Sequence, residues 1–169
     1  ESIGSVGQRN TGTRLRFWPE PSYFDSPRIS LPRLKHLLRA KAVLCPGLRV
    51  SLTVEADPDE SATWYYEEGL RGYLETCLGD AETVPAQPFL HEAHGNEEAA
   101  DWAVVWVVDG GELVAESYVN LIPTPQGGTH VNSLRSGLME ALKEFCEFRD
   151  RLPRGVKLTG EDLWEQCAY

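Results

Sequence analysis

The chain has 169 residues, of which 41% are hydrophobic and 25% are charged, a composition typical of a folded globular protein. Its length fits one ordinary domain or two small ones. No apolar run approaches the roughly 20 residues that span a bilayer, which excludes a membrane-spanning protein. The net charge of −10 argues against a protein that holds DNA with its whole surface.

The charge is distributed unevenly along the chain. Residues 1–60 carry nine basic residues (Lys and Arg) and seven acidic residues (Asp and Glu). Residues 61–128 carry one basic and twelve acidic residues, and residues 129–169 carry six basic and seven acidic residues. This change in charge coincides with a polar segment around Pro58, which predicts a boundary between two domains near residue 60. The chain begins without Met and is expected to stop inside a short helix, so we expect a piece of a larger protein.

The first elements follow from periodicity. Residues 12–18 alternate apolar and basic side chains, which predicts a half-buried strand. The turn before them predicts an earlier strand that ends near Val6. Ser30 is a good N-cap for a helix whose apolar residues recur at helical spacing over residues 31–42 and which should end at Pro46.

The middle of the chain should alternate between strands and helices. Residues 48–54 and 64–66 read as strands, and residues 69–78 as a helix. Residues 102–108 form a continuous apolar run, which is typical of a strand covered on both faces. A turn at residues 109–111 should then return the chain as a partner strand over residues 113–122.

Two helices are predicted towards the end. A long helix follows Thr129, and its apolar face comprises Val131, Leu134, Leu138, Leu142, Phe145 and Phe148. Residues 151–153 should end it. Thr159 and Asp162 resemble a capping box that begins a last short helix.

Two features could carry chemistry but are weak signals. His91 and His94 could hold a metal ion through their imidazoles, although a solvated loop is the simpler interpretation. The four cysteines form no C-x-x-C pair, which argues against a zinc site. Gly127 and Gly128 precede Thr129 at the start of the long helix, where free amides could hold a phosphate. The alternative is a tight turn with Thr129 as the N-cap, because the complete phosphate-binding motifs are missing.

Two longer motifs carry a resemblance to a family. Residues 12–19 read Gly-Thr-Arg-Leu-Arg-Phe-Trp-Pro and resemble the G-T-x-V-x-F-x-P segment of type II topoisomerase ATPase subunits. Residues 119–130 contain Val-Asn-Leu-Ile-Pro-Thr followed by Gly-Gly-Thr-His and resemble the V-N-x-I-x-T-x-x-G-G-T-H signature of the same family. Residues 39–47, 144–149 and 152–158 resemble the bacterial topoisomerase IV branch more closely than the gyrase branch.

The resemblance implies a fold and a division into domains. The fold would be two-layered, α+β or α/β. Residues 1–60 would be the C-terminal third of a GHKL ATPase domain. Residues 62–169 would be a transducer domain similar to ribosomal protein S5 domain 2, truncated at its C-terminus.

The resemblance also implies an activity and its partners. In the family, ATP and Mg²⁺ are bound by the intact ATPase subunit, which is the B subunit, and two copies of it close around DNA. The transducer relays the nucleotide state to the DNA gate, and the A subunit carries the cleaving tyrosine. The resemblance thus implies DNA, the topoisomerase IV A subunit and a second copy of the B subunit as partners, in the bacterial cytoplasm at the chromosome.

The resemblance assigns few site residues to this chain. The general base of the family would lie outside it, so no catalytic residue and no metal ligand is expected here. Thr13 would lie beside the adenine-binding carboxylate and Leu15 near the same pocket. Gly127, Gly128, Thr129 and His130 would form a structural turn of the transducer.

Arg135 lies next to the apolar face of the long helix. There it could line a DNA cavity and meet phosphates without reading sequence, or it could be exposed without a partner.

Two other functions stay open at this point. The B subunit of gyrase would have the same chemistry with supercoiling added. A non-enzymatic S5-like module that binds nucleic acid is a different class, and the acidic residues 61–128 argue against it.

Overall fold

The computed structural model describes residues 7, 11–110, 114–153 and 155–169. It divides into two compact units, Glu1–Ser30 and Leu31–Tyr169, which are described separately. The predicted boundary near residue 60 is a different division of the chain and stays a prediction. None of the helices in the described ranges is long and apolar enough to cross a membrane.

The described residues of the first unit have little regular secondary structure. Its one regular element among the described residues is a 3-10 helix, η1 (Pro21–Tyr23). The strand predicted over residues 12–18 is wrong for this structure, because the segment has no regular secondary structure and belongs to no sheet. A strand needs a neighbouring backbone to complete its hydrogen bonds, and Leu15 is 78% exposed. The strand expected to end near Val6 lies outside the described residues.

The second unit begins with helix α1 (Leu31–Leu44), which follows Ser30 directly, as predicted. Its buried side chains, including Ala42 and Val43, lie in its second half. Pro46 follows the end of the helix, and Gly47 turns the chain with a φ of 80°. Proline cannot continue a helix and glycine tolerates positive φ, so the helix ends where the sequence predicts.

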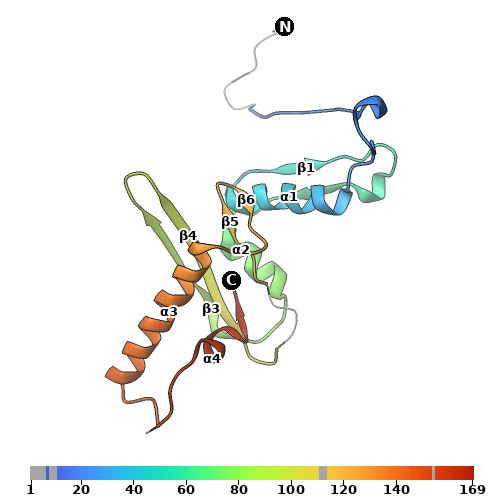
Figure 1. The fold of residues 1–169 in the computed structure, drawn as a ribbon. Helices are drawn as coiled ribbons and strands as arrows, with labels where there is room; N and C mark the ends of the chain where they lie inside the picture. Colours follow the sequence, from blue (N-terminus) through green and yellow to red (C-terminus); the bar gives the residue numbers. More distant parts are fainter. Residues whose placement is uncertain (1–6, 8–10, 111–113, 154) are drawn as a thin grey trace. The chain divides into compact units, whose positions relative to one another are not determined.

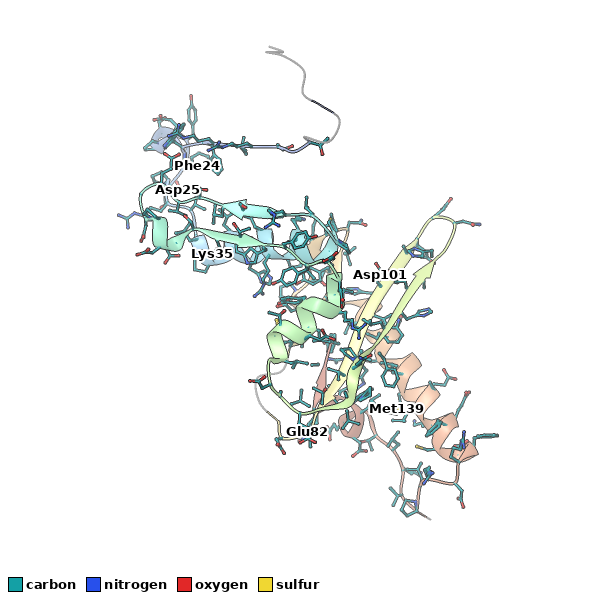
Figure 2. The ribbon with its side chains drawn as sticks, turned by 180° about the vertical axis from the view of Figure 1, so that it is seen from behind. Phe24, Asp25, Lys35, Glu82, Asp101 and Met139 are labelled. Atoms are coloured by element: carbon teal, nitrogen blue, oxygen red, sulfur yellow. The ribbon has the colours of Figure 1, made fainter. Side chains whose placement is uncertain are left out.

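A small antiparallel sheet follows helix α1. Strand β1 (Val50–Leu52) pairs with β2 (Ala62–Trp64), and the 3-10 helix η2 (Pro58–Glu60) lies between them. Lys35 of α1, labelled in Figure 2, forms an ion pair with Glu60. Both strands were predicted, although β2 begins and ends two residues earlier than expected.

The main sheet consists of three strands in the order β3-β4-β7. Strand β3 (Thr83–His94) and strand β4 (Ala99–Val107) form a long antiparallel hairpin (Figure 1). Strand β7 (Cys167–Ala168) pairs antiparallel with the other edge of β4. The consecutive residues Val104 and Val105 are both fully buried, so β4 is covered on both faces, as predicted.

The predicted partner of β4, over residues 113–122, is wrong. The hairpin partner of β4 is β3, which precedes it, and the last strand β7 lies on its other side. The backbone of residues 114–116 pairs with Tyr169, whose amide donates to the Val114 carbonyl (2.8 Å) while the Glu116 amide donates to the Tyr169 carbonyl (3.0 Å). The final strand is therefore inserted between β4 and the segment expected beside it.

Residues 118–123 form a hairpin of their own. Strand β5 (Tyr118–Val119) pairs with β6 (Ile122–Pro123) across a turn in which Asn120 and Leu121 have φ values of 49° and 65°. Two successive positive φ values are characteristic of the tight hairpin turns that match strand twist.

Three further helices complete the second unit. Helix α2 (Gly69–Leu78) has its predicted bounds. Helix α3 (Thr129–Phe148) begins and ends close to expectation, but Phe148 at its end is 84% exposed, so the described residues cover only the first part of its apolar face. Helix α4 (Gly160–Trp164) begins with the predicted capping box of Thr159 and Asp162. It does not run to the end of the chain, because strand β7 follows it.

The core lies between helix α2 and the main sheet. It is an apolar cluster comprising Leu74, Ala103, Val105, Val107 and Ala168. Cys167 beside it is buried, and this burial raises the pKa of its thiol to about 12. The side chain is therefore an inert core residue at neutral pH.

Candidate functional site

Thr13 and Leu15 lie in the first unit, and the other candidate site residues lie in the second. Both side chains are exposed on a segment without regular secondary structure. Since they are two residues apart, they would face the same side of a strand if one formed there. Their assignment to an adenine pocket stays a prediction.

The glycine-rich turn before helix α3 is held by hydrogen bonds on both of its sides. Gly127 has a φ of 68°, which favours glycine, and its amide donates to the Thr124 carbonyl at 2.8 Å. The Asn132 amide donates to the Gly128 carbonyl at 3.0 Å. A side chain at residue 128 would lie 2.9 Å from Cε1 of His130, so the missing Cβ lets the imidazole fold back over the turn.

A chain of side-chain hydrogen bonds ties this turn to the β5–β6 hairpin. The Ser117 hydroxyl lies 2.7 Å from the Thr124 hydroxyl, which lies 3.2 Å from Nε2 of His130. The Ser117 hydroxyl also donates to the Thr124 carbonyl at 3.1 Å. The sequence motif therefore brings together residues 117, 124 and 127–130 as one structural junction.

The interpretation of Thr129 as an N-cap is wrong. The N-cap of α3 is Gly128, which forms no side-chain capping bond, and Thr129 is the first helical residue. The two glycines and His130 fix the entry to the helix in place of a capping side chain. The structural role of this turn stays a prediction.

Arg135 is held by aromatic side chains near the end of the chain. Its guanidinium lies 5.3 Å from the centre of the Trp164 ring and 5.7 Å from that of Tyr169, and it donates a hydrogen bond of 3.0 Å to the Tyr169 hydroxyl. A cation over a ring face is attracted by the ring quadrupole. The alternative of an exposed cation without a partner is thus wrong, while a role towards DNA stays a prediction.

Sequence reasoning missed a cluster of polar side chains around Glu116. The carboxylate accepts from Arg39 of helix α1 at 3.2 Å, from the Tyr73 hydroxyl of α2 at 2.8 Å, and from the Tyr118 hydroxyl of β5. Arg39 and Tyr73 are 77 and 43 residues away in sequence, so no local spacing could reveal them. The available signal was that tyrosines facing a core require a hydroxyl partner.

The Glu116 cluster borders a groove of about 450 Å³ on the main sheet. Its wall includes Tyr73 of α2, Trp102 of β4 and Leu134 of α3. This size falls in the range of small-molecule pockets, but we assign no ligand to it.

The two histidines of β3 do not converge. His91 packs against Trp102 with 5.7 Å between ring centres, while His94 lies 3.8 Å from Glu92. Residues three apart in a strand point to opposite faces, so the two imidazoles cannot bind one ion. Within the described ranges, no group of three or more His, Cys, Asp or Glu side chains could hold a metal.

The comparisons with known proteins agree with the motifs. The family model of DNA gyrase B matches residues 69–169. The B subunit of DNA topoisomerase 4 from Salmonella typhimurium strain LT2 is 54% identical over 99% of this chain and 26% of its own length. The corresponding protein of Pseudomonas aeruginosa is 56% identical over 100% of the chain and 27% of its own length. The chain thus spans about a quarter of these curated relatives.

Solved structures support the fold. The 43K ATPase domain of Thermus thermophilus gyrase B, solved with an aminocoumarin, superposes with a TM-score of 0.69 at 23% identity, over 88% of this chain and 40% of that chain. The B-subunit of DNA gyrase from Myxococcus xanthus superposes with a TM-score of 0.66 at 21% identity, over 76% of this chain and 36% of that chain. These likenesses confirm the mixed α/β fold class that the motifs predicted. Because its family model matches residues 69–169, the chain belongs to the DNA gyrase B family.

Proposed function

We propose that this chain is part of the ATPase subunit of a type II DNA topoisomerase of the topoisomerase IV type. The observation that carries the proposal is the identity of 54–56% to topoisomerase 4 B subunits along almost the entire chain. The intact subunit would couple ATP binding and hydrolysis to strand passage, and thereby relax and decatenate DNA. This chain alone would be inactive.

The proposed roles of the two parts of the chain are those that the resemblance to the family implies. Residues 1–60 would complete the GHKL ATPase domain, and residues 62–169 would belong to the transducer that relays the nucleotide state to the DNA gate. The proposed partners are DNA, the topoisomerase IV A subunit and a second copy of the B subunit, in the bacterial cytoplasm at the chromosome. The whole assembly would work as a heterotetramer.

Thr13 and Leu15 fit the adenine end of ATP. Both side chains are exposed and thus accessible to a ligand, one offering a hydroxyl and the other an apolar surface for the base. ATP supplies the binding and hydrolysis energy of the cycle. Mg²⁺ accompanies ATP in the intact subunit, and we assign none of its ligands to this chain.

Replacing Thr13 with valine in the intact subunit is expected to weaken ATP binding by about 1 kcal/mol, because one hydrogen bond to the nucleotide site is lost while the side-chain shape is kept. Isothermal titration with a non-hydrolysable ATP analogue measures the change. Thr11→Val, in the same exposed segment, is the matched control and should leave the affinity unchanged. Equal affinities of the Thr13 variant and the parent would contradict the assignment.

Replacing Arg135 with glutamine is expected to reduce the stimulation of ATPase by DNA more than the basal ATPase rate. The lost cation would no longer attract phosphates, an effect that depends on salt. Arg135→Lys keeps the charge and should retain most of the DNA response. If both rates fell equally, the contacts of Arg135 with Trp164 and Tyr169 would account for the loss as a folding effect.

The proposed function is tested with the intact B subunit, reconstituted with the topoisomerase IV A subunit. We expect ATP-dependent decatenation of linked DNA circles and relaxation of supercoils. The ATP-dependent introduction of negative supercoils would instead identify a gyrase B subunit. DNA binding without any ATP-dependent strand passage would favour the non-enzymatic S5-like module.

A further inference from the structure

Glu116 joins three elements, of which helices α1 and α2 are distant from it in sequence. Its Oε1 atom accepts from Arg39 of α1 (3.2 Å) and from Tyr73 of α2 (2.8 Å), and its Oε2 atom accepts from Tyr118 of β5. Hydrogen bonds to an ionised carboxylate are stronger than those between neutral groups. One side chain therefore fastens helix α1 both to the second helix and to the β5–β6 hairpin.

The surroundings of Glu116 keep these bonds in place. The side chains of Arg39 and Glu116 are only 33% and 25% exposed, and the guanidinium also lies 5.1 Å from the centre of the Tyr73 ring. Burial is the main cause of the raised pKa of Tyr118, and the hydrogen bond to Glu116 is the second cause. Burial is likewise the main cause of the raised pKa of Tyr73. Both phenols thus remain protonated donors at neutral pH.

A second contact joins helix α1 to the same hairpin. The ammonium group of Lys41 donates to the Leu121 carbonyl in the β5–β6 turn. Arg39 and Lys41 thus fasten α1 to both ends of β5, through the carboxylate that precedes it and the turn that follows it. A displacement of α1 would act on the hairpin at two points.

The hairpin is in turn tied to the start of helix α3. Ser117, the neighbour of Glu116, lies 2.7 Å from the hydroxyl of Thr124, which lies 3.2 Å from His130 in the first turn of α3. Hydrogen bonds and the intervening backbone therefore run without interruption from α1 to α3. Contiguous networks of this kind can carry energetic coupling between distant elements.

The geometry points to Glu116 as the positioning residue that couples helix α1 to the β5–β6 hairpin and the start of α3. On the proposed function, on which this inference rests, α1 belongs to the ATPase part and the hairpin and α3 to the transducer. Glu116 would then transmit the nucleotide-dependent position of α1 to the transducer without contacting ATP. Its loss should uncouple hydrolysis from strand passage and leave nucleotide binding intact.

The test replaces Glu116 with glutamine in the intact B subunit, reconstituted with the A subunit. Glutamine keeps the size of the side chain but removes the charge that holds Arg39. We expect the number of strand passages per ATP hydrolysed to fall about fivefold or more, the lower end of typical coupling between sites, while the KM for ATP stays within about twofold of the parent.

The matched control is Glu75→Gln. Glu75 also pairs with an arginine at 3.1 Å, but that partner, Arg71, belongs to the same helix α2. This variant removes the same charge without separating two elements, so its strand passages per ATP should equal those of the parent. An equal fall in both variants would overturn the inference.

Tyr118→Phe provides a second, milder variant should Glu116→Gln fail to fold. It removes one hydroxyl donor from Glu116 and is expected to lower the passages per ATP in the same direction. An unchanged ratio in a folded variant, or a parallel fall in hydrolysis and passage, would overturn the role of Glu116. An absence of ATP-dependent strand passage in the parent protein would refute the proposed function instead.

Discussion

Replacing Ala168 with aspartate is expected to detach the last strand from the main sheet. Ala168 is fully buried and pairs with Val105 in the apolar core. An uncompensated carboxylate there should cost about 3–5 kcal/mol, unless it takes up a proton or moves out of the sheet. The measurement is native-state hydrogen exchange of the intact subunit, read at the Val107 amide, which donates to the Gln166 carbonyl at 2.9 Å.

Ala93→Asp is the matched control for this change. Ala93 lies in β3 of the same sheet but is exposed, so the new carboxylate remains hydrated. We expect less than about 0.5 kcal/mol of change, as for ordinary surface substitutions. Unchanged protection of the Val107 amide in the Ala168 variant would show that β7 does not contribute to the stability of the sheet.

Truncating Leu74 to alanine is expected to lower the local stability of the sheet by about 2–5 kcal/mol, through lost burial and the cavity left behind. Leu74 of helix α2 is 2% exposed and packs in the cluster that contains Val105, Val107 and Ala168. The free energy of opening of the β4 amides, again from hydrogen exchange in the intact subunit, reports the loss.

Leu90→Ala makes the same truncation on a side chain of β3 that is 44% exposed. Because less apolar area is withdrawn from water there, its effect should be clearly smaller than that at Leu74. If the two variants lost equal stability, the contact between α2 and the sheet would not be the principal core of this unit.

The helices could be predicted because their signals are local. Helix α2 has its predicted bounds, and α4 begins at the predicted capping box of Thr159 and Asp162. Periodicity and capping depend on residues within one or two turns of each other. The buried strand β4 was equally visible, since a run of apolar β-branched residues needs no knowledge of its neighbours.

Strand β3 was missed for a physical reason. It contains Pro85 and Pro88, which argue against a strand in sequence-based reasoning. In the structure β3 is an edge strand whose register shifts between Val84 and Phe89. Edge strands and bulges tolerate proline because one side of the backbone needs no partner there.

Strand pairing and the Glu116 cluster depend on contacts between distant residues. Strand β7 is only two residues long, which is too short to show an alternating pattern of apolar and polar residues. Its place beside β4 is set by packing. The Gly127–Gly128 turn could be recognised from its motif, whereas the donors of Glu116 come from three separate elements. Sequence therefore predicted the turn that begins α3 but not the contacts that connect it to α1.

The insertion of β7 between β4 and residues 114–116 fixes an order of events during synthesis. Val105 and Ala168 pair although roughly sixty residues separate them, and closing such a loop has an entropic cost that later contacts must offset. The ribosome releases β4 and residues 114–116 well before β7 exists. Throughout that interval the unpaired N–H and C=O groups on this edge of β4 are exposed, and pairing with another chain would begin there. The time needed to translate α3 and α4 thus sets how long this edge of β4 waits for its partner.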